Sequence, residues 1–398
     1  YTGNSAGVPT VVQAISLGWE AQYVMLKKSS GASDWLIFDS MRGVPTGGDD
    51  CALEANDSAA EDCGNEYLSF TADGFQLNGA NMNYTGDEFI YMVIRRPMKV
   101  PTAGTEVFDM DTLDGTPLPS YKSDFVVDMA FQRATTGNST PLGSRLTGAA
   151  YMVTDTNAAE SANGNWTWDF MNGRGKDTGG PTLNDYSWMF RRAPGFMDVV
   201  CYLGTGVAHT EAHGLGVIPE LIIVRNRTST GNWNTYNSTL GNTKFINLDE
   251  ATGPTTSSTR WNDTSPTASV FTVGSYYMVN QLNSDHVAYL FATLDGVSKV
   301  GSYTADATVT TIDCGFSAGA RFILIRKVGS GDWYYWDYSR GIVAGDDPYL
   351  LLNENDAEVT DTDWIDPDNS GFTITDEAGS VSNGINIDTE DYIFLAIA

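Results

Sequence analysis

The sequence predicts an all-β protein, built as a tandem array of four antiparallel, jelly-roll-like β-sandwich units of about 100 residues each. Three observations support this prediction. The same phrases recur along the chain at a spacing near 100 residues, the segments between strand-like runs are rich in Gly, Asn, Asp, Ser and Thr, and no stretch has the period of an amphipathic helix. A chain of 398 residues is also too long for one ordinary domain.

The clearest repeated phrase is centred on a tryptophan. GASDWLIFDSMRG at 31–43 matches GSGDWYYWDYSRG at 329–341, and GNWNTYNSTLG at 231–241 is a third copy. Trp233 and Trp333 lie 100 residues apart, and Trp35 lies 198 residues before Trp233, so one copy is missing near position 135. There FQRATTGNS places Ser139 where the tryptophan would stand. The sequence therefore predicts four units with a divergent second one, at 1–99, 100–197, 198–299 and 300–398.

Every unit repeats the same order of strand-like segments. A Tyr-Thr-Gly-like opening, rewritten in the second unit, is followed by an apolar strand that ends in basic residues, then by the tryptophan phrase, and finally by an aromatic strand. The apolar strands are QYVMLKK, FVVDMAFQR, ELIIVRNR and RFILIRK. Continuous apolar runs such as FILIRK and YIFLAIA are typical of strands buried on both faces. We expect each unit to have its own core, filled by Trp35, Trp233 and Trp333 where the tryptophan is kept.

Composition excludes several classes of partner. Lys and Arg number 22 against 50 Asp and Glu, a net charge of −28, and this balance repels a phosphate backbone, so no nucleic acid partner is expected. Such self-repulsion is best tolerated in a saline medium such as seawater. No run reaches the ~18 apolar residues of a membrane helix, so no membrane insertion is expected. The opening YTGNSAGVPT lacks the features of a signal peptide, so we expect a mature form or a fragment of a longer protein.

The cysteines and histidines leave two alternatives open and predict no metal centre. Cys51 and Cys63 either close a short disulfide loop or remain buried free thiols. Cys201 and Cys314 lie in different parts of the chain at non-equivalent positions, so they are expected to be buried free thiols. His209 and His213 have an i,i+4 spacing, but the glycines around them disfavour the helix that a zinc site would need.

The sequence predicts a chain that is not an enzyme and carries no cofactor. Gly-x-Ser-x-Gly, HExxH and Walker-type phosphate loops are absent. Acid pairs do recur in a GDD turn of the first and fourth units, as Asp49-Asp50 and Asp346-Asp347. Repetition at equivalent positions favours solvated, turn-forming acids; the alternative is a calcium site completed by nearby Asn56 or Asn355.

Binding is the better class of function. Tyr84, Tyr276 and Tyr277 lie near expected strand ends, where their rings could stack on sugars while loop Asn and Asp side chains reach the hydroxyls. The alternative is that these tyrosines fill cores or cover seams between units.

The second half of the chain resembles a repeated domain of tail-fibre-like virion structural proteins from marine tailed phages. The resemblance is carried by YLGTG at 202–206, HGLGVIPELIIVRNR at 213–227, GNWNTYNSTLGNTKFINL at 231–248, VAYLFATLDGVSKVGSYT at 287–304 and the landmarks from 312 to 398. The first unit matches at its landmarks and the second only loosely.

This resemblance implies a non-enzymatic protein on the virion surface, in a tail fibre or on the capsid exterior. It would serve assembly and host attachment, with other virion proteins, other copies of itself in a trimer, and a host surface glycan or protein as partners. The alternatives are a polysaccharide-binding or depolymerising adhesin and a cellular secreted adhesin or surface-filament protein.

Overall fold

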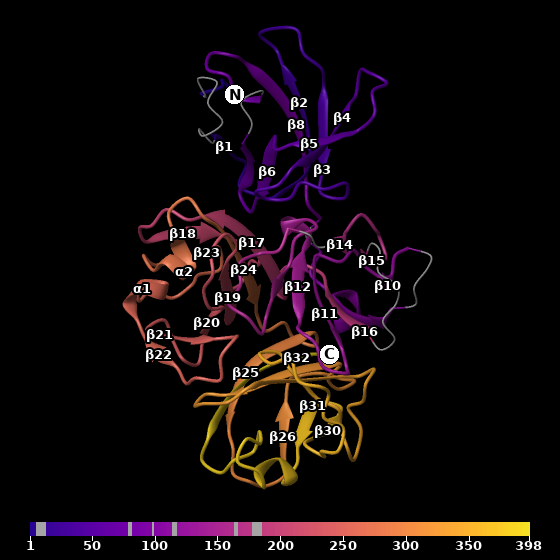
Figure 1. Ribbon diagram of the computed structural model, residues 1–398, viewed down its shortest axis with the longest axis vertical. Coiled ribbons are helices and arrows are strands. Elements are labelled where there is room, and N and C mark those ends of the chain that lie inside the picture. The colour runs from indigo at the N-terminus through magenta and orange to yellow at the C-terminus, as the bar shows by residue number, and fades with distance from the viewer. Residues whose placement is uncertain (5–12, 79–81, 98, 114–117, 163–165, 177–184) are drawn as a thin grey trace.

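The computed structural model describes residues 1–4, 13–78, 82–97, 99–113, 118–162, 166–176 and 185–398. It confirms the predicted all-β class: each of four units pairs a large and a small antiparallel sheet. In Figure 1 the first unit lies at the top, the second and third lie side by side below it, and the fourth lies at the bottom. In the described part of the chain, no helix has the length and apolar character needed to cross a membrane.

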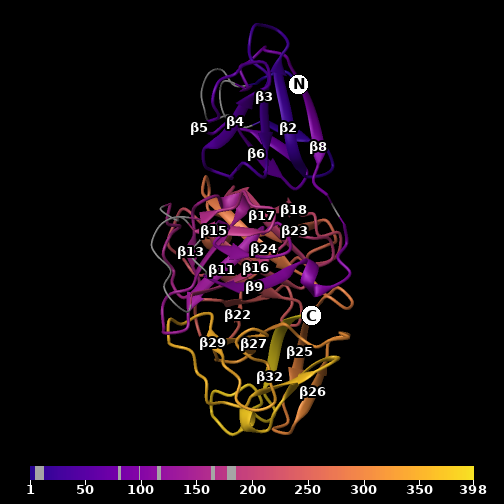
Figure 2. The same cartoon turned by 90° about the vertical axis from the view of Figure 1, so that its right-hand side faces the viewer.

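The first unit stands apart from the other three, as Figure 2 shows. Its large sheet has the order β5-β4-β3-β2-β8 and its small sheet the order β1-β7-β6. A disulfide joins β4 to β5. The strands are β1 (Gln13–Ser16), β2 (Ala21–Lys28), β3 (Leu36–Asp39), β4 (Asp50–Glu54), β5 (Asp62–Asn65), β6 (Leu68–Thr71), β7 (Gly74–Leu77) and β8 (Phe89–Arg95).

The second unit keeps the same plan although its sequence has diverged. Its large sheet has the order β13-β12-β11-β16-β9 and its small sheet the order β10-β15-β14. The strands are β9 (Phe108–Thr112), β10 (Tyr121–Lys122), β11 (Met129–Ala134), β12 (Pro141–Ser144), β13 (Met152–Val153), β14 (Trp166–Thr167), β15 (Gly173–Lys176) and β16 (Asp185–Phe190), with 3-10 turns η2 (Gly104–Glu106) and η3 (Arg145–Thr147).

The third unit has the widest large sheet, of order β17-β24-β19-β20-β21-β22, opposite the pair β18-β23. Two single-turn helices lie beside the small sheet. The elements are β17 (Met197–Leu203), β18 (His209–Ala212), β19 (Leu221–Asn226), β20 (Asn234–Asn237), β21 (Lys244–Asn247), β22 (Thr255–Thr256), α1 (Ser258–Trp261), β23 (Val270–Val273), α2 (Tyr277–Asn280) and β24 (Asp285–Phe291).

The fourth unit has the large sheet β25-β32-β27-β28-β29 and the small sheet β26-β31-β30. Its strands are β25 (Ser298–Thr304), β26 (Thr310–Asp313), β27 (Phe322–Lys327), β28 (Trp333–Asp337), β29 (Leu350–Leu351), β30 (Ile365–Asp368), β31 (Gly371–Ile374) and β32 (Asp391–Ile397), with the 3-10 turn η4 (Glu377–Gly379). Strands β17 and β25 begin just before the expected unit starts at 198 and 300.

The tryptophan phrase occupies the same place in the sheet wherever it occurs. In each unit the central strand, β2, β11, β19 or β27, pairs on one side with the last strand of the unit and on the other with the next strand of the meander. Trp35, Trp233 and Trp333 lie at the start of that next strand or directly before it. The three residues are therefore equivalent, as the sequence predicts.

Every unit has a core between its two sheets, and the last three units share a further one. Aliphatic side chains and aromatic rings facing the small sheet fill the separate cores. The opposite face of each large sheet is here called the outer face. In the second, third and fourth units this face is also buried. There all three outer faces pack into one cluster of buried apolar side chains.

Candidate functional site

The outer faces of the second, third and fourth units meet at the centre of the body that these units form, here called the block. Their central and last strands supply alternate apolar side chains, so that rings from different units contact each other. The Trp188 ring lies edge-on to Tyr335 at 5.2 Å, and Phe190 lies 6.2 Å from Phe291 between ring centroids. A wholly apolar void of about 30 Å³ remains where the three sheets converge. The three units thus form one packed body.

The expected role of the repeated tryptophans needs a correction. Trp233 and Trp333 are fully buried, yet each belongs to the shared cluster and not to the core of its own sandwich. The indole of Trp233 donates to the carbonyl oxygen of Val153 in the second unit at 3.1 Å, and that of Trp333 donates to Asn247 in the third at 3.3 Å. Trp35 is only half-buried, so the expectation that it fills a core is wrong. Among the described residues, no other unit packs against the outer face of its unit.

Three buried arginines link the same units in a cycle. The guanidinium of Arg133 in the second unit donates to the carbonyl oxygens of Leu351 and Asp356 in the fourth. The fourth unit's Arg326 donates to carbonyls of the third, at 2.7 Å for Asn247, and the third unit's Arg225 donates to Ala158 in the second. The register places these arginines at one equivalent position.

The arginines remain charged although they are buried. Burial lowers the pKa of Arg225 and of Arg326 to about 10, which leaves both protonated at neutral pH. Backbone carbonyls in place of carboxylates solvate the charge. Sequence reasoning assigned these residues no role, although the basic residue that ends each apolar strand was the available signal. The cyclic contacts show that the last three units are arranged with approximate threefold symmetry.

The first unit is joined to the block by a buried ionic network. Arg192, at the end of the second unit, makes two 2.7 Å hydrogen bonds to the carboxylate oxygens of Glu20 in the first unit. Its Nε donates to Asp198 in the third unit at 2.7 Å. Burial alone would lower the pKa of Arg192, but the charges of Asp198 and Glu20 outweigh it and raise that pKa. One guanidinium therefore ties three units together.

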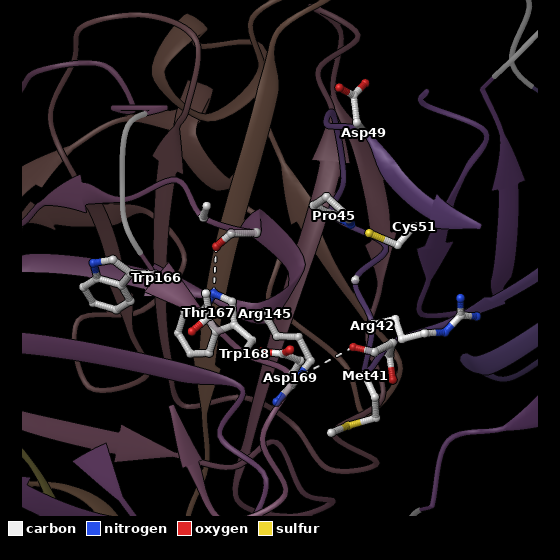
Figure 3. Close-up of a pocket in the computed structure, with 14 residues that line it drawn as sticks. Met41, Arg42, Pro45, Asp49, Cys51, Arg145, Trp166, Thr167, Trp168 and Asp169 are labelled. Atoms are coloured by element: carbon white, nitrogen blue, oxygen red, sulfur yellow. Dashed lines mark hydrogen bonds between the residues drawn. The ribbon is translucent and has the colours of Figure 1, made fainter. Parts of the chain in front are cut away.

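The junction also contains a cavity of about 250 Å³ between the first and second units, shown in Figure 3. Arg145 donates across it to the carbonyl oxygen of Ser40 at 3.4 Å, and the Trp168 indole donates to Gly148 at 2.7 Å. Arg42 in its wall is paired with Asp39 at 2.6 Å. These polar groups are thus already paired, Arg145 across the junction and the other two within their own units.

The structure separates the candidate glycan-binding tyrosines. Tyr276 and Tyr277 are neighbours in the third unit, with ring centroids 4.8 Å apart, and the Arg260 guanidinium lies 3.2 Å above the Tyr276 ring. Tyr277 is 46% exposed. Tyr84, which is 44% exposed, belongs to the first unit and does not join them. Only the third-unit pair forms an aromatic platform.

The recurring acid pairs divide into one exposed and one buried member. Asp49 and Asp346 face solvent, whereas Asp50 and Asp347 are buried. Asp50 accepts hydrogen bonds from the backbone of Leu68 at 2.7 Å, and Asp347 accepts one from Ile365 at 3.0 Å. Burial raises the pKa of each buried carboxyl to about 7. The repeated acid thus ties the GDD turn to the small sheet, and the calcium site with Asn56 or Asn355 stays a prediction.

The cysteine question has a clear structural answer. Cys51 and Cys63 form a disulfide, which was one of the two open alternatives, and Cys201 and Cys314 are free. Among the described residues, the sole cluster of three or more His, Cys, Asp or Glu side chains with metal-ligand spacing is Cys51, Glu61 and Cys63. The two sulfur atoms of this cluster are already joined in the disulfide. His209 pairs instead with Glu211 at 2.6 Å.

Comparison with known families matches residues 1–96 and 132–398 to a domain of unknown function, DUF7483. The chain belongs to the DUF7483 family. The matched residues come from all four units, so the DUF7483 match extends over the first unit and over the block of the other three. The segment between them, 97–131, contains the last residues of the first unit and the opening of the divergent second unit. A comparison with curated proteins finds no match for this DUF7483 chain.

Proposed function

We propose that this DUF7483 protein is a non-enzymatic structural protein of the virion exterior, in a tail fibre or on the capsid surface, where it serves assembly and host attachment. The observation that carries the proposal is the use of the repeated residues. Trp233 and Trp333 and the equivalent arginines lie at contacts between units. An enzyme would gather its distinctive side chains around one cleft. In this chain the repeated tryptophans and arginines instead form the contacts that hold three units in a rigid block.

Two features of the sequence support this setting. Residues 198–398 resemble the repeated domain of tail-fibre-like proteins from marine phages. The net charge of −28 suits a saline medium, where a short Debye length weakens repulsion between neighbouring chains.

The test is to locate the protein on phage particles whose genome encodes it. Particles purified on a density gradient are labelled with gold-conjugated antibody against this chain and imaged by electron microscopy. We expect label on intact particles, at fibres or on the capsid exterior. Label on uninfected cells alone would overturn the proposal in favour of a cellular adhesin.

Glycan binding is a second candidate, favoured by the aromatic platform of Tyr276 and Tyr277. The half-exposed Tyr277 ring packs against Tyr276, which the Arg260 guanidinium covers, and such a supported ring is a suitable surface for stacking on a sugar. Host envelope glycans should then be retained by the purified chain and lost with Tyr277→Ala, while Tyr84→Ala retains them. Release of reducing sugar from those glycans would contradict the non-enzymatic proposal and favour the depolymerase.

A further inference from the structure

The outer face of the first unit is apolar and open to solvent. On its last strand, β8, Ile90 is 50% exposed, Met92 51% and Ile94 53%. The equivalent strands β16, β24 and β32 bury nearly every residue. One of four equivalent faces thus lacks the cover that the other three give each other.

The strand register makes the correspondence residue by residue. Met25 pairs with Met92 in the first unit, where the other units pair Phe131 with Trp188, Ile223 with Tyr289 and Leu324 with Leu395. All of those six are buried in the shared cluster. The outer face of the first unit, called here the open face, consists of Tyr23, Met25, Trp35, Ile37, Leu53, Ile90, Met92 and Ile94.

The composition of the open face does not fit permanent contact with water. A sheet with one solvated face alternates polar and apolar residues, but β8 reads FIYMVIR and is apolar on both sides. Contiguous exposed apolar surface of this kind marks an interaction site. The basic position is also kept, since Lys27 stands where the other units have their linking arginines.

We propose that three copies of this chain associate through the open faces of their first units, in the cyclic arrangement that the second, third and fourth units adopt within one chain. The proposal names the interface behind the assembly role and rests on that proposed function for its biological setting. Three copies follow from the geometry, because equivalent faces in this chain close as a cycle of three and a closed ring leaves no face open.

The same geometry assigns a role to Lys27. In the block, each equivalent arginine reaches backbone carbonyls of the segment after the meander of the neighbouring unit, such as Leu351 and Asp356. The corresponding segment of the first unit is 54–59, since Glu54 pairs with Leu36 as Leu351 pairs with Tyr334. In the trimer, the Lys27 ammonium donates to carbonyls of that segment in an adjacent copy. Because each chain carries a charge of −28, added salt strengthens the association by screening repulsion.

The test is sedimentation equilibrium of the full chain between about 0.1 and 100 µM, in low salt and at seawater ionic strength. We expect a shift from 43.1 kDa toward three times that mass, favoured by salt. Met92→Asp places a charge in the open face and should leave a folded monomer. Ile218→Asp, at a residue 56% exposed in the third unit, is the matched control and should still form trimers.

Lys27→Met tests the geometry. Loss of three hydrogen bonds, each worth about fivefold, should weaken the trimer constant by roughly a hundredfold. A wild-type chain that stays monomeric, a dimer as the final species, or association insensitive to Met92→Asp or to Lys27→Met would each overturn the inference. A monomer would leave the placement on the virion to the gold-labelling experiment, so the two proposals fail separately.

Discussion

Trp333→Ala tests whether the last three units share one core. Trp333 is fully buried in the shared cluster, lies 5.2 Å from the Arg326 guanidinium and donates its indole N–H to the third unit. Truncating a buried tryptophan costs about 3–5 kcal/mol of unfolding free energy, from lost burial and the cavity left behind. The value should fall in the upper half of that range, because Arg326 also loses its aromatic partner. The Asn247 carbonyl keeps its 2.7 Å bond to Arg326, so no acceptor is orphaned.

The location of the damage is more informative than its size. Hydrogen exchange read by mass spectrometry follows each unit separately in one sample. We expect faster exchange in β28, where the substitution lies, in its neighbour β27, and equally in β11 and β19 of the second and third units, while β2 of the first unit keeps its protection. Trp35→Ala is the matched control, since the same residue there is half-buried, and should cost about 1 kcal/mol or less in the dilute monomer. Exchange that accelerates in the fourth unit alone would refute a shared core.

Three further predictions concern single sites. His286 is fully buried and burial lowers its pKa to about 4, so the folded protein resists a protonation that the unfolded chain accepts near pH 6.5. The free energy of unfolding should therefore fall by about 3 kcal/mol between pH 7 and pH 4. His286→Asn should flatten that part of the pH profile, and a variant that keeps the wild-type slope would contradict the prediction. Arg192→Met leaves Glu20 and Asp198 buried without their partner and should cost about 3–5 kcal/mol at the junction, seen as protease cleavage between the first and second units; an uncleaved variant contradicts this. Reducing the disulfide of the first unit, which spans 12 residues, should destabilise that unit by about 3 kcal/mol and leave the melting of the block unchanged.

Much of the fold could be predicted from the sequence because the repeat is written in local signals. The tryptophan phrase, its turns and the apolar strands recur with fixed offsets, so the four units and the equivalence of Trp35, Trp233 and Trp333 follow from spacing alone. The runs FILIRK and YIFLAIA also indicated strands buried on both faces. In a two-layer sandwich one of those faces would meet water, so the runs already required a further layer.

What covers that second face could not be predicted, because local patterns do not name distant partners. The strand FIYMVIR of the first unit is as apolar as its equivalents, yet within one chain its outer face stays exposed. The link between Glu20 and Arg192 joins residues 172 positions apart, and nothing in either neighbourhood marks them as a pair. The candidate tyrosines were chosen by expected strand ends, and this criterion cannot show that the Tyr276 ring packs against Tyr277 and under the Arg260 guanidinium.

The most direct test of the central claim, that the outer face of every unit is a self-association face, is a cryo-electron microscopy reconstruction of the full chain at a concentration where it associates. We predict three first units around a true threefold axis, with Met25, Trp35 and Met92 of each copy buried at its centre, and three blocks arranged around them. First units that stay apart with these side chains in solvent, or copies that meet through another surface, would contradict the account.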